Sequence, residues 1–562
     1  MTPSYDCHRA YGPYAGVADF LGRLAGAHPR LAARHRVELH AIVPHLDRAA
    51  TRLPVTETIR FHPARRTSAL AYGATEFIAA WAARLRRPAK LSFDNVAEAD
   101  ETTRELLDRL ARRIGPLPLR LELHEGGPPP SPARQDLRDA LGDSLLRGFY
   151  RHAARLARDG RAMVSAEQDL PTWWAYTTGL ATALAALGEA QEALDLYRQA
   201  RAATDDPQIT MSSAYATAML YARHLPPGDQ DPAQARHWLE LALRLAEQIP
   251  DPRQRALSGV FYEQGIALLD SREGHPERAL RAIDDGLARL AAVLGPQERR
   301  VDRARLLHNR AQVHLALGDP RQALADLDAV IAYDRDNCEY YMDRAALHRA
   351  AGRARAAIRD YGTAIRLGPH LPEAYYNRAT LRSERGDSRS ERADLEQAIT
   401  IEPGHVEARV ALCNLHLERG DAAAAEQCAR AGLMLAPDDP DLLCTLGLAC
   451  AERKRPVEAE ELLSQAVAGN PQLVEAWTNR AAVRFERGDT AGALADLDRA
   501  VALSSEPVPR YNRALALVRL ARWDEAAHDL AEALARPGLD RALRRDMRAE
   551  LTRARKRAQP GS

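Results

Sequence analysis

The feature that most constrains this chain is a short motif that returns every 34 residues through its C-terminal half. Asn309-Arg310-Ala311 recurs as Asp343-Arg344-Ala345 and as Asn377-Arg378-Ala379, at steps of 34 residues. It returns three periods later as Asn479-Arg480-Ala481 and then, after 33 residues, as Asn512-Arg513-Ala514. A fixed period of this length indicates small structural units that stack along one axis.

Other landmarks keep the same phase, and they define the content of a unit. One small residue recurs at Ala323, Ala357, Ala425, Ala459, Ala493 and Ala526, and Glu391 takes its place in one unit. Turn signals recur at Gly318, Gly352, Gly386, Gly420 and Gly488, and prolines recur at Pro369, Pro403, Pro437 and Pro471. Each unit is therefore predicted to be two amphipathic helices that join at a tight turn and approach closely where the small residues lie.

This pattern resembles the tetratricopeptide repeat (TPR) family, whose period is 34 residues. The resemblance covers seven regular units over residues 301–537, and it implies a mainly α protein, an α-solenoid of stacked helix pairs. Upstream, Ala193, Ala235 and Ala279 occupy the same small position at spacings of 42 and 44 residues. Residues 141–300 are therefore expected to form longer, irregular TPR-like pairs, because three extra helical turns account for about ten residues. A longer loop is the alternative explanation of the extra residues. Residues 538–562 are expected to form a basic capping helix and a tail.

Residues 1–128 do not follow the repeat and are expected to form a small α/β domain, with a Pro-rich linker at residues 129–140. A short apolar run at 89–96, a helical pattern at 101–114 and a second apolar run at 117–124 predict a strand, a helix and a strand. The segment Leu91-Ser92-Phe93-Asp94-Asn95-Val96-Ala97-Glu98-Ala99-Asp100 resembles the Walker B region of the signal-transduction ATPases known as STAND proteins. The resemblance places Asp94 where a magnesium-binding aspartate would stand, whereas Asn95 replaces the second acid of the family pattern.

The phosphate loop expected of such an ATPase is not intact. The best match to G-x-x-x-x-G-K-[ST] runs from Gly12 to Asp19, with Ala18 at the lysine position and Asp19 at the hydroxyl position. A carboxylate there would repel phosphate, and the lysine that would contact the β- and γ-phosphates is missing. The sequence therefore predicts a degenerate nucleotide-binding domain, with an unrelated α/β domain as the alternative and no ATP hydrolysis.

Composition narrows the function classes further. The 78 basic and 77 acidic residues balance, so neither nucleic acid nor an anionic membrane is predicted to attract the chain as a whole. No apolar run approaches the ~20 residues that span a bilayer, and no secretory signal is visible, so a cytoplasmic protein with free thiols is expected. His35, His40 and His45 are spaced by five and would spread around a helix, so no metal site is predicted. No catalytic constellation and no cofactor are predicted, so the chain is expected not to be an enzyme.

The TPR resemblance also implies a concave groove lined by the first helix of each unit. The sixth position of the successive units holds Asn309, Asp343, Asn377, Ala411, Thr445, Asn479 and Asn512. A carboxamide both donates and accepts hydrogen bonds, so this row could hold the backbone of an extended peptide. The alternative is that the row bonds locally. The arginine at the next position is expected to be structural and to bridge adjacent units.

Two acidic rows border the same groove. The second position holds Glu339, Glu373, Glu407, Asp441 and Glu475, and the thirteenth holds Glu384, Glu418, Glu452 and Glu486. Acids in the first turn complement the helix dipole, whereas acids near a helix C-terminus oppose it. The acidic row near the helix C-termini therefore favours a binding role. The alternative is that these acids pair locally with the adjoining arginines.

The sequence thus predicts a scaffold that binds a protein or peptide, preferably basic, in a TPR groove. The alternative is a STAND-type nucleotide-gated switch or weak NTPase that regulates a partner through the array.

Overall fold

The computed structural model describes residues 4–9, 12–43, 63–115, 117–127, 137–295, 298–536, 539 and 541–558. The chain divides into two compact units, residues 1–370 and 371–562. This division differs from the boundaries expected from the repeat phase, which remain predictions. Most of the predicted Pro-rich linker, His45 and the last four residues lie outside the described residues.

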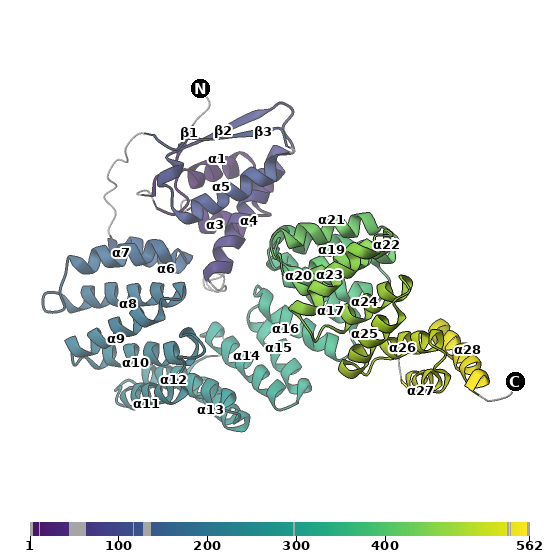
Figure 1. Cartoon of the computed structure of the whole chain (residues 1–562). Helices are drawn as coiled ribbons and strands as arrows, with labels where there is room; N and C mark the ends of the chain where they lie inside the picture. The colour runs from purple at the N-terminus through teal and green to yellow at the C-terminus, as the bar shows by residue number, and fades with distance from the viewer. Residues whose placement is uncertain are drawn as a thin grey trace. The chain divides into compact units, whose positions relative to one another are not determined.

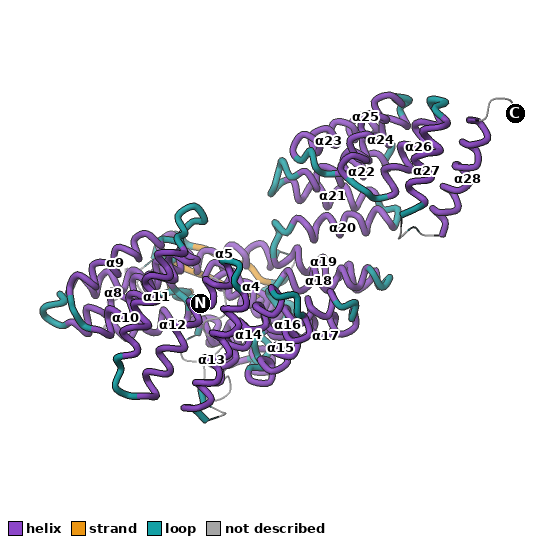
Figure 2. The backbone as a smooth tube through the Cα atoms, turned by 90° about the horizontal axis from the view of Figure 1, so that it is seen from below, coloured by secondary structure: helices purple, strands orange, loops and turns teal. Residues whose placement is uncertain are grey.

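The first compact unit opens with a small α/β region whose sheet is parallel in the order β1-β2-β3. The strands are β1 (Ser4–Asp6), β2 (Ala89–Asp94) and β3 (Leu119–Leu123), shown in orange in Figure 2. The helices are α1 (Val17–Ala27), α2 (Pro29–Ala32), α3 (Arg36–Ile42), α4 (Pro63–Ala82) and α5 (Glu101–Ile114), with the 3₁₀ turn η3 (Val96–Glu98). Phe20, Phe77, Phe93 and Leu106 are buried in its core. The predicted strand, helix and strand are confirmed, and β1 is a strand that the sequence reasoning missed.

Irregular helix pairs follow, and the longer helices among them account for most of the wide repeat spacing. They are α6 (Leu137–Arg147), α7 (Tyr150–Ala162), α8 (Leu170–Leu187), α9 (Ala190–Ala203), α10 (Pro207–Met219), the π-turn η4 (Leu220–His224), α11 (Pro232–Glu247), α12 (Pro252–Arg272) and α13 (Pro276–Val293). Helices α12 and α13 contain 21 and 18 residues. Three extra turns in a pair lengthen the repeat by about ten residues, as expected.

Fourteen helices of regular length then pair in sequence order (Figure 1). The first helices are α14 (Arg300–Ala316), α16 (Cys338–Ala350), α18 (Pro372–Ser383), α20 (Val406–Glu418), α22 (Pro440–Glu452), α24 (Val474–Glu486) and α26 (Pro507–Arg519). The second helices are α15 (Pro320–Tyr333), α17 (Ala354–Leu367), α19 (Ser388–Ile401), α21 (Ala422–Leu433), α23 (Pro456–Gly469), α25 (Thr490–Leu503) and α27 (Trp523–Leu534). The small residues of the repeat are completely buried, among them Ala323, Ala425 and Ala459, so they sit where helices approach most closely.

The last helix, α28 (Arg541–Ala558), packs on α27 and ends the stack (Figure 1). Met547 and Ala554 of α28 are fully buried in one apolar cluster with Leu530 and Ala533 of α27. The capping helix expected from the sequence therefore covers the apolar side of the last repeat.

Candidate protein-binding face of the repeat array

The candidate site is the face formed by the first helices α18, α20, α22 and α24, here called the first-helix face. On a helix, residues four, seven and eleven positions after a given residue return to nearly the same side. Glu407, Ala411, Asn414 and Glu418 have this spacing on α20. Each first helix thus carries an acid at both ends of one side, with smaller or neutral residues between them.

The acidic row at the helix C-termini is exposed to solvent. Glu384, Glu418, Glu452 and Glu486 are all exposed, and each lies at or next to the last residue of its helix. At the other end, burial and the nearby carboxylates of Asp439, Glu475 and Glu407 raise the pKa of Asp441. Glu407, Asp441 and Glu475 belong to three successive units, so their charges share one side of the array and repel one another.

The arginines beside the C-terminal row bond away from it in two units. Arg453 pairs with Glu426 of α21, and Arg487 pairs with Glu460 of α23. Within the described residues, Glu452 and Glu486 form no ion pair with these arginines. The contacts that local pairing would require are therefore missing at Glu452 and Glu486, although the positive charges of Arg453 and Arg487 remain close by.

The sixth-position row bonds locally at three of its members. The Thr445 hydroxyl donates a 2.8 Å hydrogen bond to the backbone carbonyl of Asp441, one turn earlier in α22. The Asp343 carboxylate lies 2.6 Å from His308 Nε2 and accepts a 3.1 Å hydrogen bond from Gln312. The Asn479 amide donates toward Cys444 Sγ at 3.5 Å. Asn309, Asn377 and Asn512 are half-buried and make no side-chain hydrogen bond with the described residues. Peptide binding by this row therefore stays a prediction, with these three amides as its best candidates.

The arginine that follows this position is structural, as predicted. Arg310, Arg344 and Arg513 each reach an aspartate on the second helix of the preceding unit, at 2.6, 2.8 and 3.0 Å. In five units the arginine at this position also holds, through two hydrogen bonds, a buried aspartate sixteen residues later in its own unit. These pairs are Arg310–Asp326, Arg344–Asp360, Arg378–Asp394, Arg480–Asp496 and Arg513–Asp529. The sequence analysis did not identify this second contact, although an aspartate follows the arginine by sixteen residues in each of these five units.

The positions that the sequence matched to a phosphate loop and a Walker B aspartate lie at the carboxyl edge of the sheet, and no comparison supports a nucleotide-binding domain there. Gly12 belongs to the loop after β1, while Ala18 and Asp19 lie in the first turn of α1 and Asp94 ends β2. The side chain of Asn95 donates a 2.8 Å hydrogen bond to Asp6. Burial and the carboxylates of Asp6, Asp100 and Asp94 raise the pKa of the Cys7 thiol to about 12. This edge is therefore electronegative, which opposes phosphate binding.

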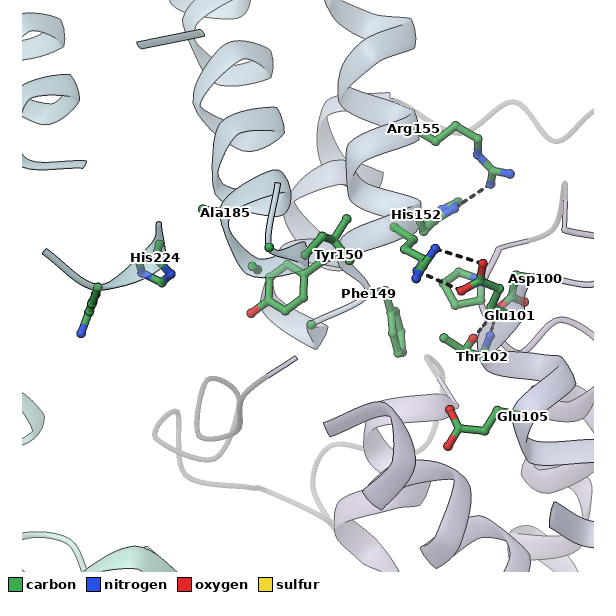
Figure 3. A pocket seen from close by; sticks show the side chains of 17 residues that line it. Asp100, Glu101, Thr102, Glu105, Phe149, Tyr150, His152, Arg155, Ala185 and His224 are labelled. Carbon is green, nitrogen blue, oxygen red and sulfur yellow. Dashed lines mark hydrogen bonds and ion pairs between the residues drawn. The ribbon is translucent and has the colours of Figure 1, made fainter. Parts of the chain in front are cut away.

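A cavity of about 590 Å³ lies between this α/β region and the first long helices. Its lining includes Phe149, Tyr150 and His152 of the helical part and Asp100 and Glu101 of the α/β region (Figure 3). Glu101 pairs with Arg151 at 2.9 Å, and Asp100 caps α5 by accepting from the Thr102 and Thr103 backbones. Burial and Arg155 lower the pKa of His152 to about 4, so this imidazole is neutral at pH 7. The Glu101–Arg151 pair joins α5 to α7.

Two features are absent from the described part of the chain. There, no three His, Cys, Asp or Glu side chains gather in a way that could hold a metal ion. No helix in it combines the length and apolar character that a membrane span requires.

Comparisons with known proteins agree with the repeat. Tetratricopeptide-repeat family models match residues 308–372, 372–405, 392–445 and 444–506. Protein FlbA of Caulobacter vibrioides is 32% identical over 103 residues, which are 18% of this chain and 17% of FlbA. This chain therefore aligns with less than a fifth of that relative.

Solved structures of repeat proteins are similar at low sequence identity. A tetratricopeptide repeat protein from Parabacteroides merdae is 18% identical with a TM-score of 0.40, covering 45% of this chain and 99% of that protein. The Cut9–Hcn1 complex of APC/C gives 15% identity and a TM-score of 0.37, covering 74% of this chain and 96% of that one. From the family models and the helix pairs together, residues 308–506 of this chain are tetratricopeptide repeats.

Proposed function

We propose that this protein is an interaction scaffold that holds a basic segment of another protein against the first-helix face. The observation that carries the proposal is the pair of acidic rows on α18, α20, α22 and α24. Like charges in a row repel one another, and at Asp441 burial and the neighbouring carboxylates together raise the pKa. A bound chain rich in Arg or Lys relieves that repulsion, which supplies part of the binding free energy.

The binding chemistry follows from the exposure of these carboxylates. Exposed charges attract at long range and are screened within about 10 Å at 0.1 M salt. The rows should therefore speed association with a basic segment more than they slow its dissociation. The neutral residues between the rows, such as Ala411 and Asn414 on α20, contact the backbone and the apolar parts of the same segment.

A titration with a fluorescent Arg/Lys-rich peptide tests the proposal, with anisotropy recorded at 50 and 500 mM NaCl. Changing Glu418→Lys with Glu452→Lys should weaken binding at least about tenfold at low salt, mainly through slower association. The matched control is Glu461→Lys with Glu532→Lys, two exposed acids on second helices, which should leave the affinity nearly unchanged. Salt-independent binding, or equal loss in both variants, would contradict the proposal.

The nucleotide-gated switch is the less favoured function. Ala18 and Asp19 replace the lysine and hydroxyl of a phosphate loop, and Asp6, Asp94 and Asp100 make the neighbouring sheet edge electronegative. We expect ATP hydrolysis at background level and no rise in melting temperature with ATP or ADP, because a bound ligand would stabilise the fold. ATP turnover that disappears in Asp94→Ala would favour the switch instead.

A further inference from the structure

The capping helix α28 presents a basic stripe to solvent. Arg541, Arg545, Arg548 and Arg555 are spaced by four, three and seven residues, so they share one side of the helix. All four are exposed, whereas Met547, on another side, is fully buried against α27. The helix is therefore amphipathic: its apolar side caps the array, and its basic side faces water.

Most of this positive charge is not balanced within the helix. Its sequence, RALRRDMRAELTRARKRA, contains seven arginines and one lysine against one aspartate and one glutamate. Arg545 pairs with Asp546, and Arg553 pairs with Glu550. Arg541, Arg548 and Arg555 form no ion pair with any described residue. These three charges therefore remain available to an acidic surface.

The spacing of these three arginines matches the spacing of the acidic rows. They are seven residues apart, which corresponds to about 10.5 Å along a helix at 1.5 Å per residue. Successive first helices pack directly, α20 on α22 and α22 on α24. Packed helices lie about 8–10 Å apart, and each one contributes one acid to a row. Three successive arginines can thus meet Glu418, Glu452 and Glu486 in register.

The stripe does not reach this face within its own chain. Both views show α28 at the end of the stack, beyond α26 and α27 (Figures 1 and 2). The buried Met547 and Ala554 keep it on α27. Opposite charges at matched spacing, held apart in one copy, can meet only between two copies if α28 stays in place.

We propose that the basic stripe of α28 in one copy docks on the acidic first-helix face of a second copy. The proposal rests on the proposed function, because it uses the same face as a receptor for basic segments. The contact is heterologous, so it produces rings or open chains unless two copies exchange it reciprocally. A basic partner protein would compete with α28 for the face, so partner binding would release the self-association.

Sedimentation velocity of the full chain at 50 and 500 mM NaCl tests the self-association. We expect species larger than the monomer at low salt, and a dissociation constant at least about tenfold higher at 500 mM, since exposed charges are screened. Arg541→Glu with Arg548→Glu and Arg555→Glu should abolish association. The matched control, Arg87→Glu with Arg104→Glu and Arg112→Glu, carries the same change in net charge on exposed sites of the α/β region and should keep it.

A charge exchange makes the test specific to the two surfaces. A chain with Glu418→Arg, Glu452→Arg and Glu486→Arg should not associate with itself, but it should associate with the Arg541→Glu triple variant. Failure of this mixture to associate would overturn the proposal, as would a monomeric native chain at ~100 μM in 50 mM NaCl. If a basic peptide still binds while the native chain stays monomeric, only the self-docking fails. If the peptide does not bind either, the proposed function fails with it.

Discussion

Five of the seven regular repeats are braced by a buried arginine–aspartate pair, and two are not. In α20–α21 the arginine and aspartate positions hold Leu412 and Cys428, and in α22–α23 they hold Leu446 and Leu462. Both replacements join apolar clusters with neighbouring residues. Both members of the pair change together, so no charge is left buried without its partner.

This difference shows that the two positions must match each other: they hold either an arginine with an aspartate or two apolar residues. A buried ion pair pays a desolvation cost that roughly cancels its attraction, so well-packed apolar residues can replace it with little loss. The braced repeats nonetheless gain directionality, because each guanidinium is fixed by two bonds to one aspartate. Four of the five arginines also bond to the second helix of the preceding unit, namely Arg310, Arg344, Arg480 and Arg513. Units with the brace should therefore be sensitive to single changes and tolerant of paired ones.

The largest effect is expected when one member of a brace is removed. Arg513→Leu leaves Asp529, which is 3% exposed, without the guanidinium that now bonds both of its oxygens. An unpartnered buried carboxylate should cost about 3–5 kcal/mol. Hydrogen exchange should show the loss as reduced protection of α26 and α27. Leu446→Met, a change in an apolar unit at the same repeat position, serves as control and should cost less than about 1.5 kcal/mol.

Replacing both members should recover most of that loss. Arg513→Leu with Asp529→Leu imitates the α22–α23 unit, so we expect stability within about 1 kcal/mol of the native chain. Urea unfolding of the single and double variants would give the coupling between the two residues. A double variant as unstable as Arg513→Leu alone would show that the apolar units depend on packing that the last repeat lacks.

Glu391 gives the comparison a third case, a single acid in a position that is small in the other units. It is 7% exposed, and burial raises its pKa despite a hydrogen bond from Ser383. Because the pKa of Glu391 is higher in the folded chain than in the unfolded chain, burial of its charged form destabilises the fold. This destabilisation is absent at low pH and appears as the pH rises through the pKa of the unfolded chain. Glu391→Gln should therefore stabilise the chain by about 1 kcal/mol at pH 7 and have no effect near pH 3.

Thermal unfolding of Glu391→Gln at both pH values would check this sign. The control is Glu402→Gln, an exposed acid close by, which should show no such pH dependence. A destabilising Glu391→Gln at pH 7 would mean that the hydrogen bond with Ser383 outweighs the desolvation of the carboxylate.

The sequence predicted the repeat array well because its signals are local and repeated. Period, small residues and turn glycines mark the same boundaries, and helix pairing follows from them. The Arg–Asp braces were only half predicted, since the sequence showed the arginine row but not which acid each arginine would choose. The α/β region was harder, because a three-residue strand such as β1 carries too little pattern to detect. The binding face remains a proposal, since burial and exposure say which carboxylates face water but not what they meet.

The smallest expected change in stability concerns the turn of α22–α23, one of the two units that lack the arginine–aspartate pair. Five units place a glycine with positive φ before the second helix, and Gly420 has φ 75°. In α22–α23 the same position holds Lys454 with φ 60°, a left-handed conformation that costs a side chain about 1 kcal/mol. Lys454→Gly should therefore stabilise the array by about 0.5–1 kcal/mol, partly offset by the greater freedom of glycine in the unfolded chain. Thermal unfolding would measure it, with Gly420→Lys as the reverse change. If Lys454→Gly destabilises the chain, then the lysine side chain contributes more to this turn than its backbone strain removes.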